Sequence, residues 1–284
     1  RSQQRNGINL IMAYTPMQLA EAFLKTGELD DALDALNQQL AAEPADDDAR
    51  RLRLQVLMRL RQPEHLSQAS ADMATISEKT ATDWQMLSIL AVQTDDVETA
   101  IEAIHKARDL APDDDRLTER LLDLLLSAEQ YDAALSLVRE QARTWRWLER
   151  EGDVLVLLGD DMLATARYRL VLAQLENFKD TMRQDYWHAF RVRALLARAH
   201  AYRRLGHTTP AREHYNAAQA ILGDDVSIQF NLGLLQAQDG NLDDAIAICK
   251  SAHSNASETL QAEMLRSLSD DDEALQRIAS ALDT

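Results

Sequence analysis

The 284 residues could form two average domains or one long repeat array, so length alone decides little. Aromatic residues are scarce at 5%, and eight glycines and five prolines supply few turns, which argues against a sandwich, barrel or propeller. The net charge of −17 disfavours non-specific binding to nucleic acid or to an anionic membrane surface. The composition therefore predicts an all-α chain.

The single cysteine, Cys249, cannot form an internal disulfide, which favours a reducing compartment and hence the cytoplasm. The longest apolar run is far shorter than the roughly 20 residues of a membrane span. Because the sequence begins with Arg rather than Met, we expect the native N-terminus to lie upstream. Residues 1–12 are then a tail or a remnant of that upstream sequence.

From residue 13 onward the chain repeats itself with a period of 34. Alanines mark the repeats: Ala100 and Ala134 are one period apart, Ala32 lies two periods before Ala100, and Ala211 and Ala245 form a second pair in phase. Around each alanine the sequence predicts a helix, a short polar turn and a second helix that carries the alanine. A fixed period of this length is typical of a solenoid.

The pattern resembles the tetratricopeptide repeat. In the third copy Trp84, Leu87 and Ser88 are followed by Ala100 and Ile104, and in the fifth Leu158-Gly159 precedes Ala164 and Tyr168. The resemblance implies a right-handed superhelical solenoid of antiparallel helix hairpins over residues 13–284, with about seven repeats and a shortened C-terminal one. The copies centre on Ala32, Leu66, Ala100, Ala134, Ala164, Ala211, Ala245 and, for the last, Ala274.

Three departures from the period predict irregular places. In the second copy Arg53 replaces a large apolar residue and Leu66 replaces the alanine, so this hairpin is displaced or its helices are rotated. Only 30 residues separate Ala134 from Ala164, which predicts a tight junction near 142–150. The interval from Ala164 to Ala211 is 47 residues, which predicts a longer helix or a loop near 177–190 and leaves a two-lobed array possible.

Small and aromatic residues of the repeat have packing roles. We expect Gly152 and Gly233 to lie where the two helices of a hairpin approach closely. The aromatic residues at repeat positions are predicted to be core, and the tryptophans outside the motif to fill the irregular junctions rather than to bind a ligand. The first group comprises Phe23, Trp84, Tyr168, Tyr202 and Tyr215, and the second Trp145, Trp147 and Trp187.

Acidic runs recur along the chain, but none has the ligand spacing of an EF-hand. Each run lies at the predicted start of a helix, where a carboxylate caps free amide groups and opposes the helix dipole. The runs begin at Asp30, Asp46, Asp95, Asp113, Asp160, Asp224, Asp243 and Asp270. We interpret them as caps.

Catalytic and cofactor motifs are not recognisable. The histidines His200, His207 and His214 are spaced by seven, but the middle one falls in a turn, so we expect no metal site. Without a phosphate loop, a nucleophile elbow or paired carboxylates, we expect no enzymatic activity and no cofactor.

In the tetratricopeptide family, repeat positions 2, 5, 6, 9, 12 and 13 of each first helix line a concave groove that binds partners. The resemblance places six acidic and ten basic residues of this chain on those positions, so the groove is positive although the chain is negative. The basic residues are Lys25, Arg51, Arg59, Arg116, Arg120, Arg146, Arg150, Arg193, Arg203 and Arg204.

Two interpretations of the arginines stay open. Nearby acids, Glu119, Asp123, Glu149 and Asp153, each lie three residues after an Arg and could pair with it. Alternatively, the arginines hold an acidic segment or a terminal carboxylate of a partner by bidentate contacts. The candidate partner-binding residues are Arg51, Arg116, Arg120, Arg146, Arg150, Arg193 and Arg203.

The sequence thus predicts a protein-binding scaffold whose groove takes a protein or peptide, acidic or extended in character. No nucleic-acid partner and no membrane span in this chain are expected. The alternative is the sensory or oligomerisation region of a larger regulator, or the substrate-recruiting arm of an enzyme, with the effector domain upstream. The oligomeric state is left open.

Overall fold

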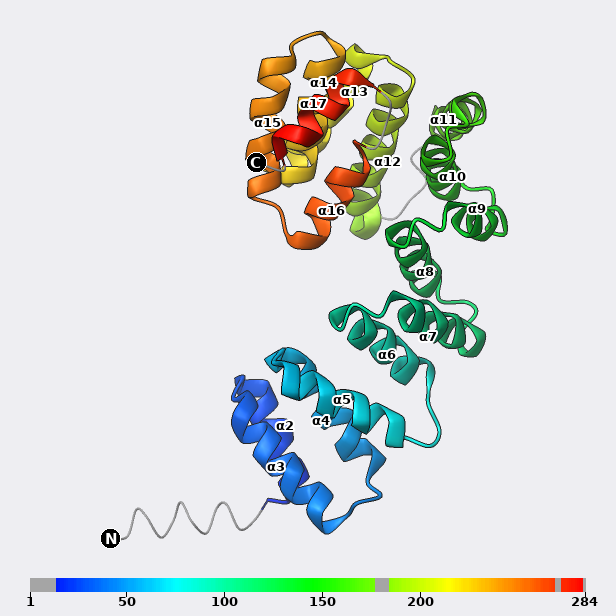
Figure 1. Cartoon of the computed structure of the whole chain (residues 1–284). Coiled ribbons are helices and arrows are strands. Elements are labelled where there is room, and N and C mark those ends of the chain that lie inside the picture. The colour runs from blue at the N-terminus through cyan, green and yellow to red at the C-terminus, as the bar shows by residue number, and fades with distance from the viewer. Residues whose placement is uncertain (1–13, 177–183, 269–271, 283–284) are drawn as a thin grey trace. The chain divides into compact units, whose positions relative to one another are not determined.

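The computed structural model describes residues 14–176, 184–268 and 272–282. All regular elements in these residues are helices, and Figure 1 shows them as successive hairpins. The all-α class predicted from the sequence is therefore confirmed. The chain forms two compact units, Arg1–Glu129 (unit 1) and Gln130–Thr284 (unit 2).

In the part of the chain that the structure describes, no helix is both long and apolar enough to cross a bilayer.

Unit 1 contains the first three hairpins and the first helix of the fourth repeat. Helix α2 packs on α3, α4 on α5 and α6 on α7, while α3 also packs on α4 and α7 on α8. Each core cluster therefore joins consecutive helices, as in a repeat array. The helices are α2 (Pro16–Thr26), α3 (Leu29–Ala42), α4 (Asp47–Leu60), α5 (Pro63–Thr75), α6 (Ala81–Gln93), α7 (Val97–Leu110) and α8 (Asp115–Ser127).

Unit 2 continues the pattern, with α10 on α11, α12 on α13 and α14 on α15. Its core clusters again connect each hairpin to the next. The helices are α9 (Tyr131–Arg139), α10 (Trp145–Leu157), α11 (Asp161–Glu176), α12 (Gln184–Arg204), α13 (Thr208–Leu222), α14 (Val226–Gln238), α15 (Leu242–Ser254), α16 (Glu258–Arg266) and α17 (Glu273–Leu282).

The repeat alanines lie where the register predicts. Ala32, Ala100, Ala211 and Ala245 are completely buried on the second helices of their hairpins. A methyl group at these points lets the next helix approach without leaving a void.

The second copy departs from this register. Leu66 is only half-buried, and Ala69, three residues later, is completely buried in its place. Arg53 extends to Asp72 on α5, where its Nε lies 2.8 Å from a carboxylate oxygen. An ion pair therefore joins α4 and α5 where other copies use apolar packing, because Arg53 cannot be buried without a counter-charge.

Two glycines mark close helix approaches, as predicted. A Cβ atom on Gly152 would lie 2.8 Å from the ring of Tyr168, and one on Gly233 would lie 2.7 Å from Sγ of Cys249. Both glycines lie on first helices and face the second helix of the same hairpin. Any larger residue would force the hairpin apart.

The junctions between repeats differ in length. The interval from Ala134 to Ala164 is short because α9 has only nine residues. Trp147 is buried at the start of α10, and Trp145 makes an edge-to-face contact with Phe190 of α12, 6.3 Å between ring centroids. Both tryptophans therefore pack at the short junction, as predicted for tryptophans outside the motif.

The interval from Ala164 to Ala211 is long in part because α12, at 21 residues, is longer than the other first helices in the described chain. The lengthened first helix of the sixth copy is thus present. Residues 177–183 and the side chain of Trp187 lie outside the described residues.

The C-terminal repeat is incomplete. Figure 1 shows α17 against α14 and α15, and α15 packs more extensively on α17 than on α16. Ile278 of α17 is completely buried in the same cluster as Phe230 and Leu234 of α14. Helix α17 therefore covers the end of the last full hairpin, where a following repeat would otherwise pack.

Most acidic runs cap helices. Carboxylates of Asp46, Asp96, Asp114, Asp160 and Asp225 accept hydrogen bonds from backbone N–H groups two or three residues later. Those N–H groups have no partner within the helix, so the bonds stabilise each helix start. The runs at 30–31 and 243–244 lie in the first turns of their helices, where they oppose the helix dipole without forming a side-chain cap. The start of the run at 270–272 lies outside the described residues.

Candidate functional site

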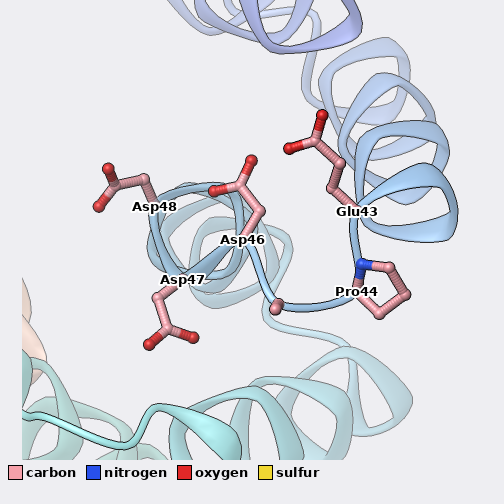
Figure 2. A pocket seen from close by; sticks show the side chains of 6 residues that line it. Glu43, Pro44, Asp46, Asp47 and Asp48 are labelled. Carbon is pink, nitrogen blue, oxygen red and sulfur yellow. The ribbon is translucent and has the colours of Figure 1, made fainter.

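The hollow between α3 and α4 in unit 1 is lined by acidic side chains. Figure 2 shows Glu43, Asp46, Asp47 and Asp48 around it. Asp46 caps α4 and accepts a 2.8 Å hydrogen bond from Gln39, and Asp47 forms a 2.8 Å ion pair with Arg50 along α4. These contacts give Asp46 and Asp47 local structural roles.

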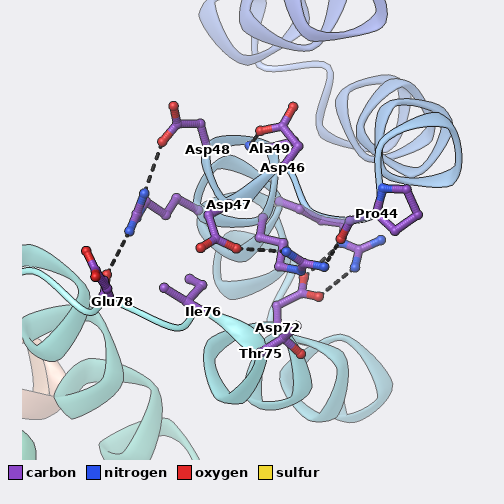
Figure 3. Close-up of polar contacts among 12 residues, drawn as sticks. Pro44, Asp46, Asp47, Asp48, Ala49, Asp72, Thr75, Ile76 and Glu78 are labelled. Carbon is purple, nitrogen blue, oxygen red and sulfur yellow. Dashed lines mark hydrogen bonds and ion pairs between the residues drawn. The ribbon is translucent and has the colours of Figure 1, made fainter.

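Arg51, a predicted partner-binding residue, joins α4 to the start of α6. Its Nε lies 3.0 Å and 3.1 Å from the two carboxylate oxygens of Asp83. Its terminal nitrogens donate to Asp48 and to the backbone oxygen of Glu78, both labelled in Figure 3. Burial alone would raise the pKa of Asp83, but hydrogen bonds from Arg51 and Thr80 outweigh it and hold that pKa low. The Arg51 guanidinium is thus engaged within unit 1.

The two predicted residues on α8 have different surroundings. Arg116 is largely exposed and forms a bidentate contact with Asp114, both bonds 2.9 Å long. That hydrogen bond raises the pKa of Arg116. Arg120, one turn later, is half-buried.

The remaining predicted residues lie in unit 2, on first helices. Arg146 and Arg150 are on α10, and Arg193 and Arg203 are on α12. Arg146 lies over the ring of Trp147, 5.9 Å from its centroid, and both Arg150 and Arg193 are exposed.

The acids of α10 have partners on other helices. Oε1 of Glu149 lies 3.1 Å from Nδ1 of His200 on α12, and the hydroxyl of Tyr168 on α11 donates a 2.8 Å hydrogen bond to Asp153. These contacts link first helices to each other and to the core. Each acid therefore has a partner on another helix.

A cavity of about 160 Å³ opens on this face of unit 2. Val156 of α10, Arg203 and Arg204 of α12, and Leu234, Ala237 and Gln238 of α14 line it, together with Asp161 of α11, Asp272, and Ala274 and Leu275 of α17. The six residues on first helices occupy repeat positions 9, 12 or 13, counted from the buried alanines. The positions that the repeat register assigns to the groove therefore share one concavity in unit 2.

Among the predicted partner-binding arginines, Arg203 is the one that is buried. It is 6% exposed, and burial together with the neighbouring charge of Arg204 lowers its pKa. The sequence predicted Arg203 to line the groove but did not predict that its side chain is buried.

Unit 2 contains a second arginine cluster that was not predicted from the sequence. Glu151 of α10 is buried, and its carboxylate lies 3.1 Å from Arg139, 2.7 Å from Arg143 and 2.7 Å from Arg167. Burial alone would raise the pKa of Glu151, but hydrogen bonds from the three arginines outweigh it and lower that pKa. The signal in the sequence was a charged residue between Leu148 and Leu155, on the apolar face of a helix.

The evenly spaced histidines do not converge. His200 bonds Glu149, whereas His214 stacks on Tyr202, 5.6 Å between centroids, and His207 lies at the edge of the same ring. Across the described residues, no group of three or more His, Cys, Asp or Glu side chains is arranged to hold a metal ion.

Comparison with known proteins agrees with the repeat architecture described above. A family model described as the tetratricopeptide repeat matches residues 17–64, 86–145 and 196–258, which is more than half of the chain. The chain belongs to the tetratricopeptide repeat family. The resemblance noted from the sequence is therefore confirmed, and such repeats generally serve as protein–protein interaction scaffolds.

Solved structures of tetratricopeptide repeat proteins share the fold. One from Parabacteroides merdae is 12% identical, with a TM-score of 0.61 over 95% of this chain and 98% of that one. The C-terminal part of a repeat-containing protein from Cytophaga hutchinsonii is 11% identical, with a TM-score of 0.50 over 85% and 97%. At these identities the likeness concerns the fold alone. A search of curated proteins found no significant match.

Proposed function

We propose that the chain is a protein-binding scaffold and that the first helices of unit 2 bind an acidic, extended segment of a partner protein. The observation that carries the proposal is the charge of the groove positions on α10, α12 and α14. They hold two carboxylates and five arginines, namely Arg146, Arg150, Arg193, Arg203 and Arg204.

The contacts of the two acids support this assignment. Glu149 lies against His200 and Asp153 accepts the Tyr168 hydroxyl, so each acid also bonds a residue on another helix. A carboxylate from a partner would add charge-assisted hydrogen bonds to the guanidinium groups. Because the chain as a whole carries −17, a positive groove favours one orientation of an acidic ligand.

The proposal assigns different roles to the arginines of unit 1. Arg51 holds α4 to α6 through Asp83, and Arg116 is paired with the Asp114 that caps its own helix. Their guanidinium groups are satisfied by these contacts. We therefore base the binding surface on unit 2.

A binding titration tests the proposal. The probe is a fluorescein-labelled peptide of alternating Glu and Gly, capped at both ends, and the readout is fluorescence anisotropy with the full chain. Reversing two exposed groove residues, Arg150→Glu with Arg193→Glu, should weaken binding at least about tenfold, because each exposed pair contributes up to about 1 kcal/mol and the new charges repel the ligand. Binding should also weaken as salt approaches about 0.15 M, where the Debye length is about 8 Å.

Arg169→Glu supplies a matched control. Arg169 is exposed on α11, a second helix, so the substitution changes the net charge as much as each of the two groove reversals does, without touching the groove. We expect it to leave the affinity nearly unchanged. Equal weakening by Arg169→Glu, or undiminished binding by the double variant, would show that the groove is not the binding surface.

A further inference from the structure

Arg203 is a buried cation without a counter-ion. Its Nε is hidden from solvent and has no hydrogen-bond partner among the described residues, and Arg203 forms no ion pair with any described carboxylate. Placing a charge in the protein interior is costly unless an opposite charge or several hydrogen bonds compensate it. The fold therefore keeps Arg203 in a position that an anion would stabilise.

The polar groups beside Arg203 cannot supply that negative charge. Burial raises the pKa of Tyr215 to about 12 and that of Tyr168 well above its usual value, so both phenols stay protonated and neutral near pH 7. Arg204, the next residue, is a second cation. None of these three neighbours therefore supplies a negative charge to Arg203.

The cavity described above gives an anion access to this position. Arg203 and Arg204 line it together with the apolar side chains of Val156, Leu234 and Ala237. Its volume of about 160 Å³ suits a single small group rather than a folded element. Because Arg203 itself is almost completely buried, a charged hydrogen bond to it is stronger than one at the surface.

The rim of the cavity selects among anions. Asp161 and Asp272 line it, and both residues are exposed. The carboxylate of Asp272 accepts hydrogen bonds from the backbone N–H groups of Ala274 (2.8 Å) and Leu275 (3.2 Å) at the start of α17. These two acids repel a dianion more than a monoanion, which favours a carboxylate over a phosphate.

We infer that this cavity is a carboxylate pocket, in which one Glu or Asp side chain of the partner's acidic segment inserts and accepts hydrogen bonds from Arg203. The inference rests on the proposed function, since it identifies the point where the bound segment is anchored. Arg146, Arg150 and Arg193 then contact the segment along the rest of the groove. Removing the anchor should cost more affinity than removing one exposed arginine, because the buried bond is shielded from solvent.

Nuclear magnetic resonance of the arginine Nε–Hε groups tests the pocket directly in the full chain. The probe is the capped Glu-Gly peptide, the control probe is the same peptide with Gln in place of Glu, and the Arg203 signal is assigned with Arg203→Gln. We expect the Glu peptide, and not the Gln peptide, to shift the Arg203 signal saturably. In anisotropy, Arg203→Gln should weaken binding about tenfold or more, whereas Arg193→Gln should weaken it only a few-fold.

Ala237→Leu keeps Arg203 and fills part of the cavity, so it tests the pocket even if Arg203→Gln unfolds unit 2. It should abolish the shift of the Arg203 signal. An unshifted Arg203 signal in the wild type, or full affinity in both Arg203→Gln and Ala237→Leu, would overturn the pocket. If the Arg150→Glu, Arg193→Glu variant still loses binding in that case, the proposed function stands without the pocket.

The source of the carboxylate is tested separately with sodium acetate. If the pocket serves a partner segment, acetate should shift the Arg203 signal only at concentrations far above those at which the peptide saturates it. Saturation by acetate at the peptide's own concentrations would assign the pocket to a free carboxylate and overturn the partner assignment.

Discussion

Replacing Glu151 by glutamine should destabilise unit 2 markedly. The Glu151 carboxylate is 1% exposed and lies within 3.1 Å of nitrogens from Arg139, Arg143 and Arg167. Glutamine keeps the volume and one acceptor oxygen but removes the only negative charge in this cluster of four residues. Three guanidinium groups would then face one another without compensation, from α9, from α11 and from the turn between α9 and α10.

The size of the effect follows from the exposure of the partners. Arg139 and Arg143 are 45% and 52% exposed, so solvent already screens their contributions, which we place at about 1 kcal/mol or less each. Arg167 is only 20% exposed. Breaking a buried pair of this kind costs about 3–5 kcal/mol, and the retained glutamine oxygen reduces the loss. We therefore expect Glu151→Gln to lower the free energy of unfolding by about 3 kcal/mol.

Urea unfolding followed by tryptophan fluorescence measures this loss. In a Trp84→Phe background the remaining tryptophans, Trp145, Trp147 and Trp187, all belong to unit 2. The midpoint should fall by about 1–2 M urea, given a slope of about 1–3 kcal/mol per molar. The control is Glu140→Gln, an exposed carboxylate at the end of α9. A change below about 0.5 kcal/mol, comparable with that of Glu140→Gln, would refute the reasoning.

The remaining predictions concern pH and packing. The folded pKa of Glu151 lies below its ordinary value of 4.5, so its contribution to the free energy of unfolding is complete above about that pH and is lost as the pH falls through the lowered value. The difference in unfolding free energy between wild type and Glu151→Gln should therefore shrink in acid. A difference that grows there would contradict the assignment. Ala100→Leu at a completely buried anchor should cost about 1–3 kcal/mol in thermal or urea unfolding, whereas the exposed helical Ala71→Leu should cost almost nothing, and equal costs would place the register in error. Gly233→Ala should destabilise the packing of α14 on α15, because the added Cβ would lie 2.7 Å from Sγ of Cys249. The better helix propensity of alanine should not offset this loss. A stabilised variant would show that the hairpin can open without cost.

Features with a local or periodic cause could be predicted from the sequence. The alanines at intervals of 34 must face a neighbouring helix wherever the repeat stacks, so the hairpins and their buried anchors follow from spacing alone. The caps at Asp46 and Asp96 depend only on residues three positions away. For the same reason Gly152 and Gly233 could be assigned to close contacts within one hairpin.

Features that depend on distant partners could not be predicted. Arg51 pairs with Asp83, 32 positions later, and the shift of the buried position from Leu66 to Ala69 depends on how α4 and α5 settle around Arg53. No local pattern distinguishes such an arginine from one that faces solvent.

The burial of Arg203 is a second case of this kind. Repeat position alone gives Arg203 and the exposed Arg193 the same groove role. Their difference arises because Tyr168 and Tyr215 lie beside Arg203 and α17 returns over the end of the last hairpin. The candidate site could therefore be located on the first helices, but its anchor could not.

Photo-crosslinking of the acidic peptide tests the central claim most directly. A capped Glu-Gly peptide with a central benzoylphenylalanine is bound to the full chain, irradiated and mapped by mass spectrometry. We predict crosslinks on the first helices of unit 2, α10, α12 and α14, and their loss in the Arg150→Glu, Arg193→Glu variant but not in Arg169→Glu. Crosslinks concentrated on the second helices α11, α13 and α15, or unchanged by the double substitution, would contradict the assignment of the groove.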